Sequence, residues 1–120
     1  MLLQLVPLRI PTGWTVKWNI FTEVSTEDFT DEEHVHWMEY SEDLLLLVNN
    51  NNNKILDLGW YPEGKPQGQY TLLLIDQYDD IEQQTAAWDT PLVKFKTRDI
   101  DEVKLKIEKV LLQVNSGDFS

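Results

Sequence analysis

The sequence predicts an α+β fold: a single, mainly antiparallel β-sheet of about six strands, with one C-terminal amphipathic α-helix packed on it. Short apolar runs separated by turn-forming residues fill most of the chain, and helical spacing becomes clear only near the C-terminal end. Too few helical patterns lie between the runs to form the crossovers that parallel strands need. The length of 120 residues fits one domain over residues 1–120, which buries roughly two-thirds of its unfolded surface and so has one core.

The N-terminal part predicts a β-hairpin. Leu2–Ile10 is interpreted as a strand that ends at the turn Pro11–Gly13, because Pro lacks a backbone donor and Gly permits the turn. Trp14–Phe21 follows as a second strand, in which large apolar residues alternate with polar ones. This period of two places four side chains on one face of the sheet: Trp14, Val16, Trp18 and Ile20.

A second hairpin is predicted in the middle of the chain. Two apolar runs, Leu44–Val48 and Ile55–Tyr61, flank the tract Asn49–Asn53, and Asn accepts the left-handed conformations that turns require. The Pro- and Gly-rich segment 62–68 must be a connection. Tyr70–Ile75 is almost continuously apolar, which predicts a central strand covered on both faces.

The C-terminal part combines an edge strand with the helix. Residues 76–89 are expected to form a long loop or a short exposed helix, and Leu92–Lys96 alternates as an edge strand whose lysines face water. Asp99 with Glu102 matches a capping box, and Asn115–Gly117 ends the helix. Between these ends one helical stripe is apolar: Ile100, Val103, Ile107, Val110, Leu111 and Val114.

The charge balance restricts the partners. With 21 acidic and 10 basic residues the net charge is −11, so contacts with nucleic-acid phosphates or anionic lipid are disfavoured, and a basic or apolar partner is expected. The absence of cysteine excludes disulfides and thiolate chemistry and is compatible with a reducing cytosol. The N-terminus lacks the basic region of a signal peptide, and the longest apolar run, Leu44–Val48, is far below the ~20 residues of a membrane span.

No motif of known chemistry stands out, so neither an enzyme nor a cofactor is expected. His34 and His36 flank one residue beside carboxylates, but two ligands do not make a metal site, and the alternative is a pair of partly exposed histidines. The carboxylates between Asp76 and Glu82 lack the spacing of a calcium loop. A Gly-x-Ser-x-Gly elbow and a phosphate-binding glycine loop are both absent from the sequence.

Two acidic stretches interleaved with aromatic residues predict a protein interface. Segment 23–43 holds nine carboxylates and segment 76–89 holds five, and neither contains Lys or Arg. Carboxylates steer a basic partner and aromatic side chains anchor it. The alternative is a solvated acidic surface whose aromatics belong to the core. The candidate contacts are Asp28, Asp31, Glu32, Glu33, Asp76, Asp79, Asp80 and Glu82, with Trp37 and Tyr78 as anchors.

Three stretches in the C-terminal two-thirds of the chain carry a resemblance to known proteins. Leu56–Gly64, Gly68–Leu74 and Pro91–Arg98 resemble, in their strand-rich order and acidic setting, small immunity proteins of bacterial polymorphic and contact-dependent toxin systems. The resemblance implies a cytoplasmic inhibitor that covers the active site or substrate groove of one cognate toxin domain, often a basic nuclease. It assigns no site residue.

Two other functions remain open from the sequence. One is an acidic structural or regulatory module that forms an oligomer or binds a peptide through its apolar sheet face. The other is a small enzyme that uses His34 or His36.

Overall fold

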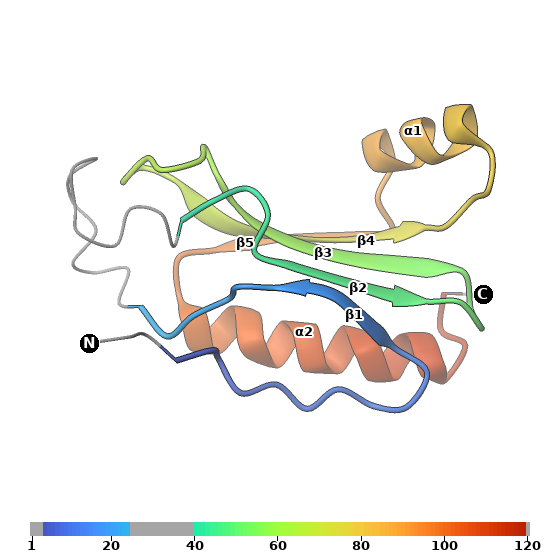
Figure 1. Ribbon diagram of the computed structural model, residues 1–120, viewed down its shortest axis with the longest axis horizontal. Coiled ribbons are helices and arrows are strands. Elements are labelled where there is room, and N and C mark those ends of the chain that lie inside the picture. Colours follow the sequence, from blue (N-terminus) through green and yellow to red (C-terminus); the bar gives the residue numbers. More distant parts are fainter. Residues whose placement is uncertain (1–3, 25–39, 120) are drawn as a thin grey trace.

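The computed structural model describes residues 4–24 and 40–119, which form one antiparallel sheet and two helices (Figure 1). The five strands follow one another across the sheet in chain order, and every neighbouring pair is antiparallel. The α+β prediction is confirmed, with five strands in place of about six and a second, short helix. The elements are β1 (Thr15–Asn19), β2 (Leu45–Asn49), β3 (Lys54–Tyr61), β4 (Gln69–Asp76), α1 (Ile81–Asp89), β5 (Val93–Thr97) and α2 (Ile100–Asn115).

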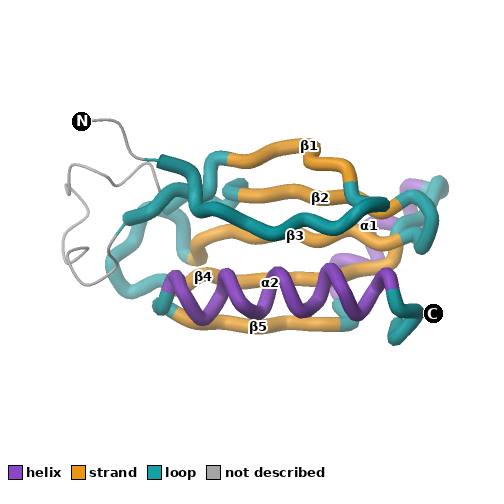
Figure 2. Tube along the Cα trace, turned by 90° about the horizontal axis from the view of Figure 1, so that it is seen from below, coloured by secondary structure: helices purple, strands orange, loops and turns teal. Residues whose placement is uncertain are grey.

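Helix α2 covers one face of the sheet, running along β4 and β5 (Figures 1 and 2). Its predicted stripe is confirmed, because Val103, Ile107 and Val110 are fully buried against the strands. Asp99 caps its first turn by accepting hydrogen bonds from the backbone N–H groups of Asp101 and Glu102. No helix among the described residues is long and apolar enough to cross a membrane.

An aromatic cluster closes the core beside the start of α2. The Trp60 ring lies 4.6 Å from that of Tyr40 and 5.1 Å from that of Tyr70, measured between centroids. Trp60 also donates its Nε1–H to the Lys65 carbonyl, and the Arg98 guanidinium lies over its ring at 5.3 Å. These contacts attach the 62–68 connection to the sheet.

The N-terminal segment does not form the strand predicted for Leu2–Ile10. Within its described part, pairing is limited to one isolated bridge between Leu5 and Thr22. Pro7 and Pro11 remove the donors that a longer ladder would need, and the segment instead packs Val6 on the core.

Strand β1 also differs from the prediction of a single apolar face over Trp14–Phe21. The register shifts between Val16 and Trp18, so that Val16 opposes Leu47 while Trp18 opposes Leu46. This bulge at Lys17 puts Val16 and Trp18 on opposite faces of the sheet. Periodicity does not reveal such a bulge, because the sequence alternates without interruption through it.

The asparagine tract forms the predicted turn and also holds the end of α2. Asn49 is fully buried, donates to the Asn115 Oδ1 at 3.0 Å and accepts the backbone N–H of Asn52 at 3.0 Å. Asn52 in turn donates its side-chain amide to the Val114 carbonyl at 3.1 Å. The β2–β3 turn therefore satisfies carbonyl and amide groups at the C-terminal end of α2.

Replacement of Asn49 by alanine is expected to lower the free energy of unfolding by about 2 kcal/mol, because it removes both hydrogen bonds of a fully buried side chain, to the Asn115 Oδ1 and from the Asn52 backbone N–H. Chemical denaturation measures the change. Asn50→Ala in the same tract is the matched control, since Asn50 is exposed, and it should change the free energy by less than about 0.5 kcal/mol. Equal effects of the two substitutions would contradict this role of Asn49.

Helix α1 lies on the opposite side of the sheet from α2, but it covers only one end of that face (Figure 1). Ala87 of α1 is buried and so is Ile75 of β4, whereas Leu73 of β4 stays half-buried. The interior position predicted for Tyr70–Ile75 is confirmed, but on the face turned from α2, helix α1 covers only its C-terminal end. Strand β5 is the predicted edge strand, with Lys94 and Lys96 exposed.

Candidate functional site

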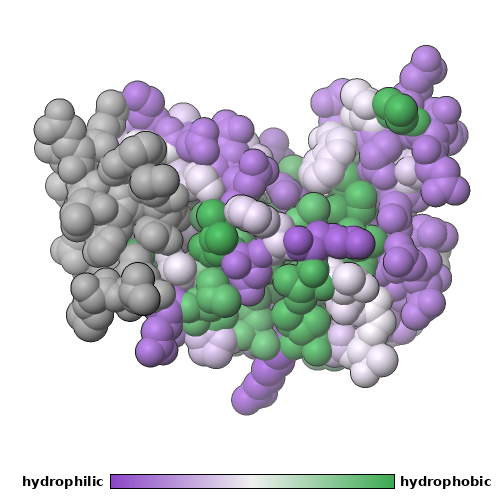
Figure 3. Space-filling model, in the orientation of Figure 1, coloured by the Kyte–Doolittle hydropathy of each residue, from purple (hydrophilic) through white to green (hydrophobic). Residues whose placement is uncertain are grey.

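The sheet face turned away from α2 is the candidate functional site, and we call it the open face. Strand alternation and the register place its members, because cross-strand partners point to the same side. Figure 3 shows the surface hollowed beside the protruding α1. The open face comprises Trp18, Leu46, Ile55, Asp57, Tyr61, Thr71, Leu73, Lys94 and Lys96.

Asp57 lies at the centre of the open face. It opposes Leu46 on one side and Leu73 on the other, and Trp18 and Lys94 continue the same row to the two sheet edges. No described residue gives the Asp57 carboxylate a hydrogen bond or an ion pair. Burial raises the pKa of Asp57 to about 7, and the nearby charge of Asp43 adds to the rise. The face thus holds a carboxylate that the described chain solvates poorly.

A loop with further carboxylates lies beside Asp57. Gly59 permits its close approach, because a Cβ at that position would lie 2.1 Å from the Glu42 carbonyl oxygen. Trp18 donates its Nε1–H to the Asp43 carbonyl at 2.8 Å, which fixes the loop from the other side. Burial raises the pKa of Tyr61 to about 12, with the charges of Asp57 and Glu42 among the further causes. This end of the open face is therefore both acidic and aromatic.

The end of the open face next to α1 forms a hollow of about 470 Å³, which we call the lysine hollow. Its floor is Thr71 and Leu73, and each opposes a lysine of β5, Lys96 and Lys94 respectively. Its remaining lining residues are Tyr61 from β3 and, from α1 and the turn after it, Trp88, Asp89 and Pro91.

Part of the predicted acidic interface lies around the start of α1, outside the open face. Asp76 makes an ion pair with Lys54 at 2.8 Å, and Asp80 caps α1 by accepting the backbone N–H of Gln83. Asp79 and Glu82 are exposed, and so is the ring of Tyr78. Two of these five candidates thus make contacts that stabilise the fold, and partner contact by the set stays a prediction.

The other predicted residues lie outside the described residues. These are the four carboxylates of the first acidic stretch, its aromatic anchor and the histidine pair: Asp28, Asp31, Glu32, Glu33, Trp37, His34 and His36. Among residues 4–24 and 40–119, no three His, Asp or Glu side chains gather as ligands for a metal ion.

Sequence reasoning missed Asp57. A signal was available, because Asp57 is a single carboxylate within the apolar run Ile55–Leu58, on the parity opposite to Leu56 and Leu58. A lone charge at such a position marks the less buried face of a strand. Asp57 belongs to neither of the two acidic stretches, so an interpretation based on those stretches passed over it.

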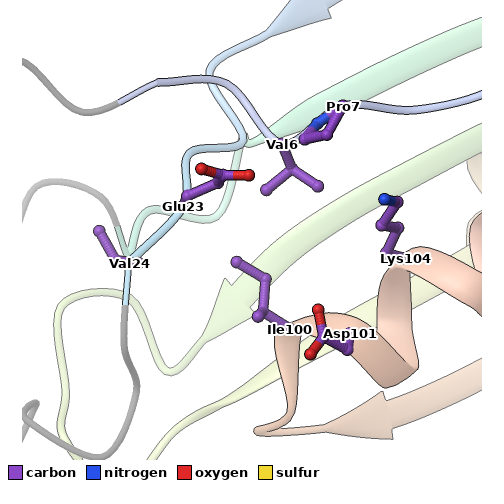
Figure 4. A pocket seen from close by; sticks show the side chains of 7 residues that line it. All are labelled: Val6, Pro7, Glu23, Val24, Ile100, Asp101 and Lys104. Atoms are coloured by element: carbon purple, nitrogen blue, oxygen red, sulfur yellow. The ribbon is translucent and has the colours of Figure 1, made fainter.

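A second hollow, of about 340 Å³, lies between the N-terminal segment and the first turn of α2 (Figure 4). Its charged residues are of both signs and come from two sides, with Glu23 on one and Lys104 on the other (Figure 4). Its lining also reaches Val24, the last described residue before the gap at 25–39. We therefore assign no ligand class to this second hollow.

Comparison with protein-family models, curated proteins and solved structures finds no match to this chain.

Proposed function

We propose that this chain is a non-enzymatic immunity protein that acts in the cytoplasm and uses its open face to bind a basic toxin domain, whose active site or substrate groove it occludes. The observation that supports this function is the half-buried carboxylate of Asp57, which pairs with none of the described residues and lies at the centre of the open face. The resemblance to immunity proteins supplies the class of partner.

A basic partner fits the charge of the open face around Asp57 and the Glu42–Asp43 loop, whereas Lys94 and Lys96 lie on the β5 side of the same face. Ionised Asp57 is costly to hold in the free protein, and a Lys or Arg side chain placed against it relieves that cost. The exposed rings of Trp18 and Tyr61 lie on the same face and supply aromatic anchors of the kind that dominate interface energetics. The net charge of −11 adds long-range attraction.

The exposed carboxylates around the start of α1 act in this proposal as a steering rim. Asp79 and Glu82 make no ion pair with a described residue, so their charges act on an approaching partner without a competing internal bond. Surface charges of this type change association rates more than dissociation rates.

A tagged pull-down from the host lysate at low and moderate salt, followed by growth rescue, tests the proposal. We expect capture of one basic protein, toxic when expressed alone and harmless when expressed with this chain. Capture of only further copies of this chain would instead support the oligomeric module, and a captured protein that shows no toxicity would overturn the immunity function.

The kinetics of the captured pair give a sharper check. Asp79→Lys is expected to slow association several-fold at low salt and to have little effect at high salt, because screening removes the steering term. Asp118→Lys is the matched control, since Asp118 is exposed beyond the C-terminal end of α2. Equal slowing by both substitutions would show that net charge alone steers the partner and would remove the rim from the interface.

A further inference from the structure

The lysine hollow differs in charge from the rest of this acidic molecule. It holds two lysines and one carboxylate, Asp89, so its formal charge is positive in a chain whose net charge is −11. No described residue gives Lys94 or Lys96 an ion pair or a hydrogen bond. The ammonium groups are therefore free to bind an anion.

A hydroxyl on the floor of the hollow points to the same chemistry. Thr71 lines the hollow with only 5% of its surface exposed, and its hydroxyl makes no hydrogen bond with a described residue. A hydroxyl that faces the hollow without such a partner can donate a hydrogen bond to a ligand there. Lys96 stands directly opposite Thr71 across the strand pair. The two can donate to one oxyanion.

The other walls of the hollow are apolar. Trp88 and Tyr61 supply rings and Leu73 an aliphatic floor. A volume of about 470 Å³ lies within the range of small-molecule sites, which combine apolar walls with a few placed polar groups.

We infer that the lysine hollow binds a carboxylate carried on an apolar, ring-bearing body, with Lys94, Lys96 and Thr71 holding the carboxylate and Trp88 and Tyr61 contacting the ring. The formal charge of the lining, two lysines against Asp89, matches a single carboxylate better than a dianionic phosphate. The inference does not rest on the proposed toxin partner, because its evidence is the lining of the hollow and not the Asp57 carboxylate, although Tyr61 serves in both.

The direct test is a titration of the full chain with phenylacetate, followed by amide and indole NMR signals. We expect binding of about millimolar strength, as suits a ligand of few atoms, with shifts at Thr71, Lys94, Lys96 and the Trp88 indole. Phenylacetamide, which has the same ring without the charge, should bind at least tenfold more weakly. Absence of shifts at millimolar phenylacetate, or equal binding of the amide, would overturn the inference.

Variants separate the ligand contacts from the fold. The double substitution Lys94→Gln with Lys96→Gln should weaken binding at least tenfold, whereas Lys104→Gln with Lys109→Gln, which removes the same charge from α2, should leave it unchanged. Thr71→Val, which keeps the shape of the side chain, should weaken binding several-fold. Asp89→Asn should strengthen binding by removing the repelling charge, and a gain of affinity cannot come from a damaged fold. Inorganic phosphate binding more tightly than phenylacetate would contradict the carboxylate assignment.

A peptide with a free C-terminal Phe distinguishes the two sources of such a carboxylate. Binding much tighter than phenylacetate, and lost on amidation, would identify a chain end as the ligand. Binding equal to phenylacetate would identify a small free acid. Both results keep the chemistry that the hollow requires.

Discussion

Replacement of Trp60 by alanine is expected to lower the free energy of unfolding by about 3–5 kcal/mol. The Trp60 side chain is fully buried between Tyr40 and Tyr70. Its loss leaves a cavity, removes the hydrogen bond to the Lys65 carbonyl and removes the ring under Arg98. Chemical denaturation followed by circular dichroism measures the change.

A second tryptophan supplies the control for that experiment. Trp88 is a residue of the same size on α1, but it is 37% exposed, so Trp88→Ala should cost less than about 1 kcal/mol. Equal destabilisation by the two substitutions would contradict a special contribution of the aromatic cluster around Trp60 to the stability of the core.

Much of the fold could be predicted from the sequence because local pattern and burial agree over most elements. The buried stripe of α2 follows the helical spacing of its apolar residues, and the exposed lysines of β5 follow the alternation of its sequence. The prediction of a strand at Leu2–Ile10 was wrong because Pro7 and Pro11 cannot donate backbone hydrogen bonds to a neighbouring strand. The apolar residues of this segment pack on the core without a continuous strand pairing. The bulge in β1 is a matter of register, and register is set by the partner strand.

The candidate site was less predictable because it depends on what is left uncovered. The apolar stripe of α2 indicates that this helix packs on the sheet. Helix α1 is only nine residues long and has a weak apolar side, so its sequence does not indicate how much of the sheet it covers. That docking uses Gln84, which donates to the Asp76 carbonyl and accepts the backbone N–H of Tyr78. Whether Asp57 is half-buried or solvated therefore depends on the three-dimensional arrangement of strands far apart in the chain.

Replacement of Asp57 by asparagine is expected to stabilise the free protein at pH 8. The folded-state pKa of about 7 lies above the ordinary value of 3.8, so the folded chain keeps a proton that the unfolded chain releases as pH rises. The stability of the native protein therefore falls between about pH 4 and pH 7, by about 2–4 kcal/mol once Asp57 is fully ionised in both states. An asparagine side chain cannot ionise, so the variant should lose none of this stability.

Denaturation of Asp57→Asn and of the native protein across pH 4–8 measures that difference. The two curves should nearly coincide at pH 4, where Asp57 is protonated, and should separate steadily up to pH 8. Asp79→Asn is the matched control, because Asp79 is exposed, and its difference from the native protein should not change with pH in this way. A constant offset for Asp57→Asn would show that the carboxylate is already solvated in the folded chain.

The same substitution is expected to weaken binding of a basic partner by at least about 30-fold at neutral pH, because it removes one member of a desolvated charge pair. Binding by the native protein should weaken as pH falls below 7, since protonation of Asp57 removes the charge that the partner contacts. A variant that is more stable and binds less would indicate that the chain keeps a destabilising carboxylate for its partner. A stabilised variant with unchanged affinity would separate the two effects and would remove Asp57 from the interface.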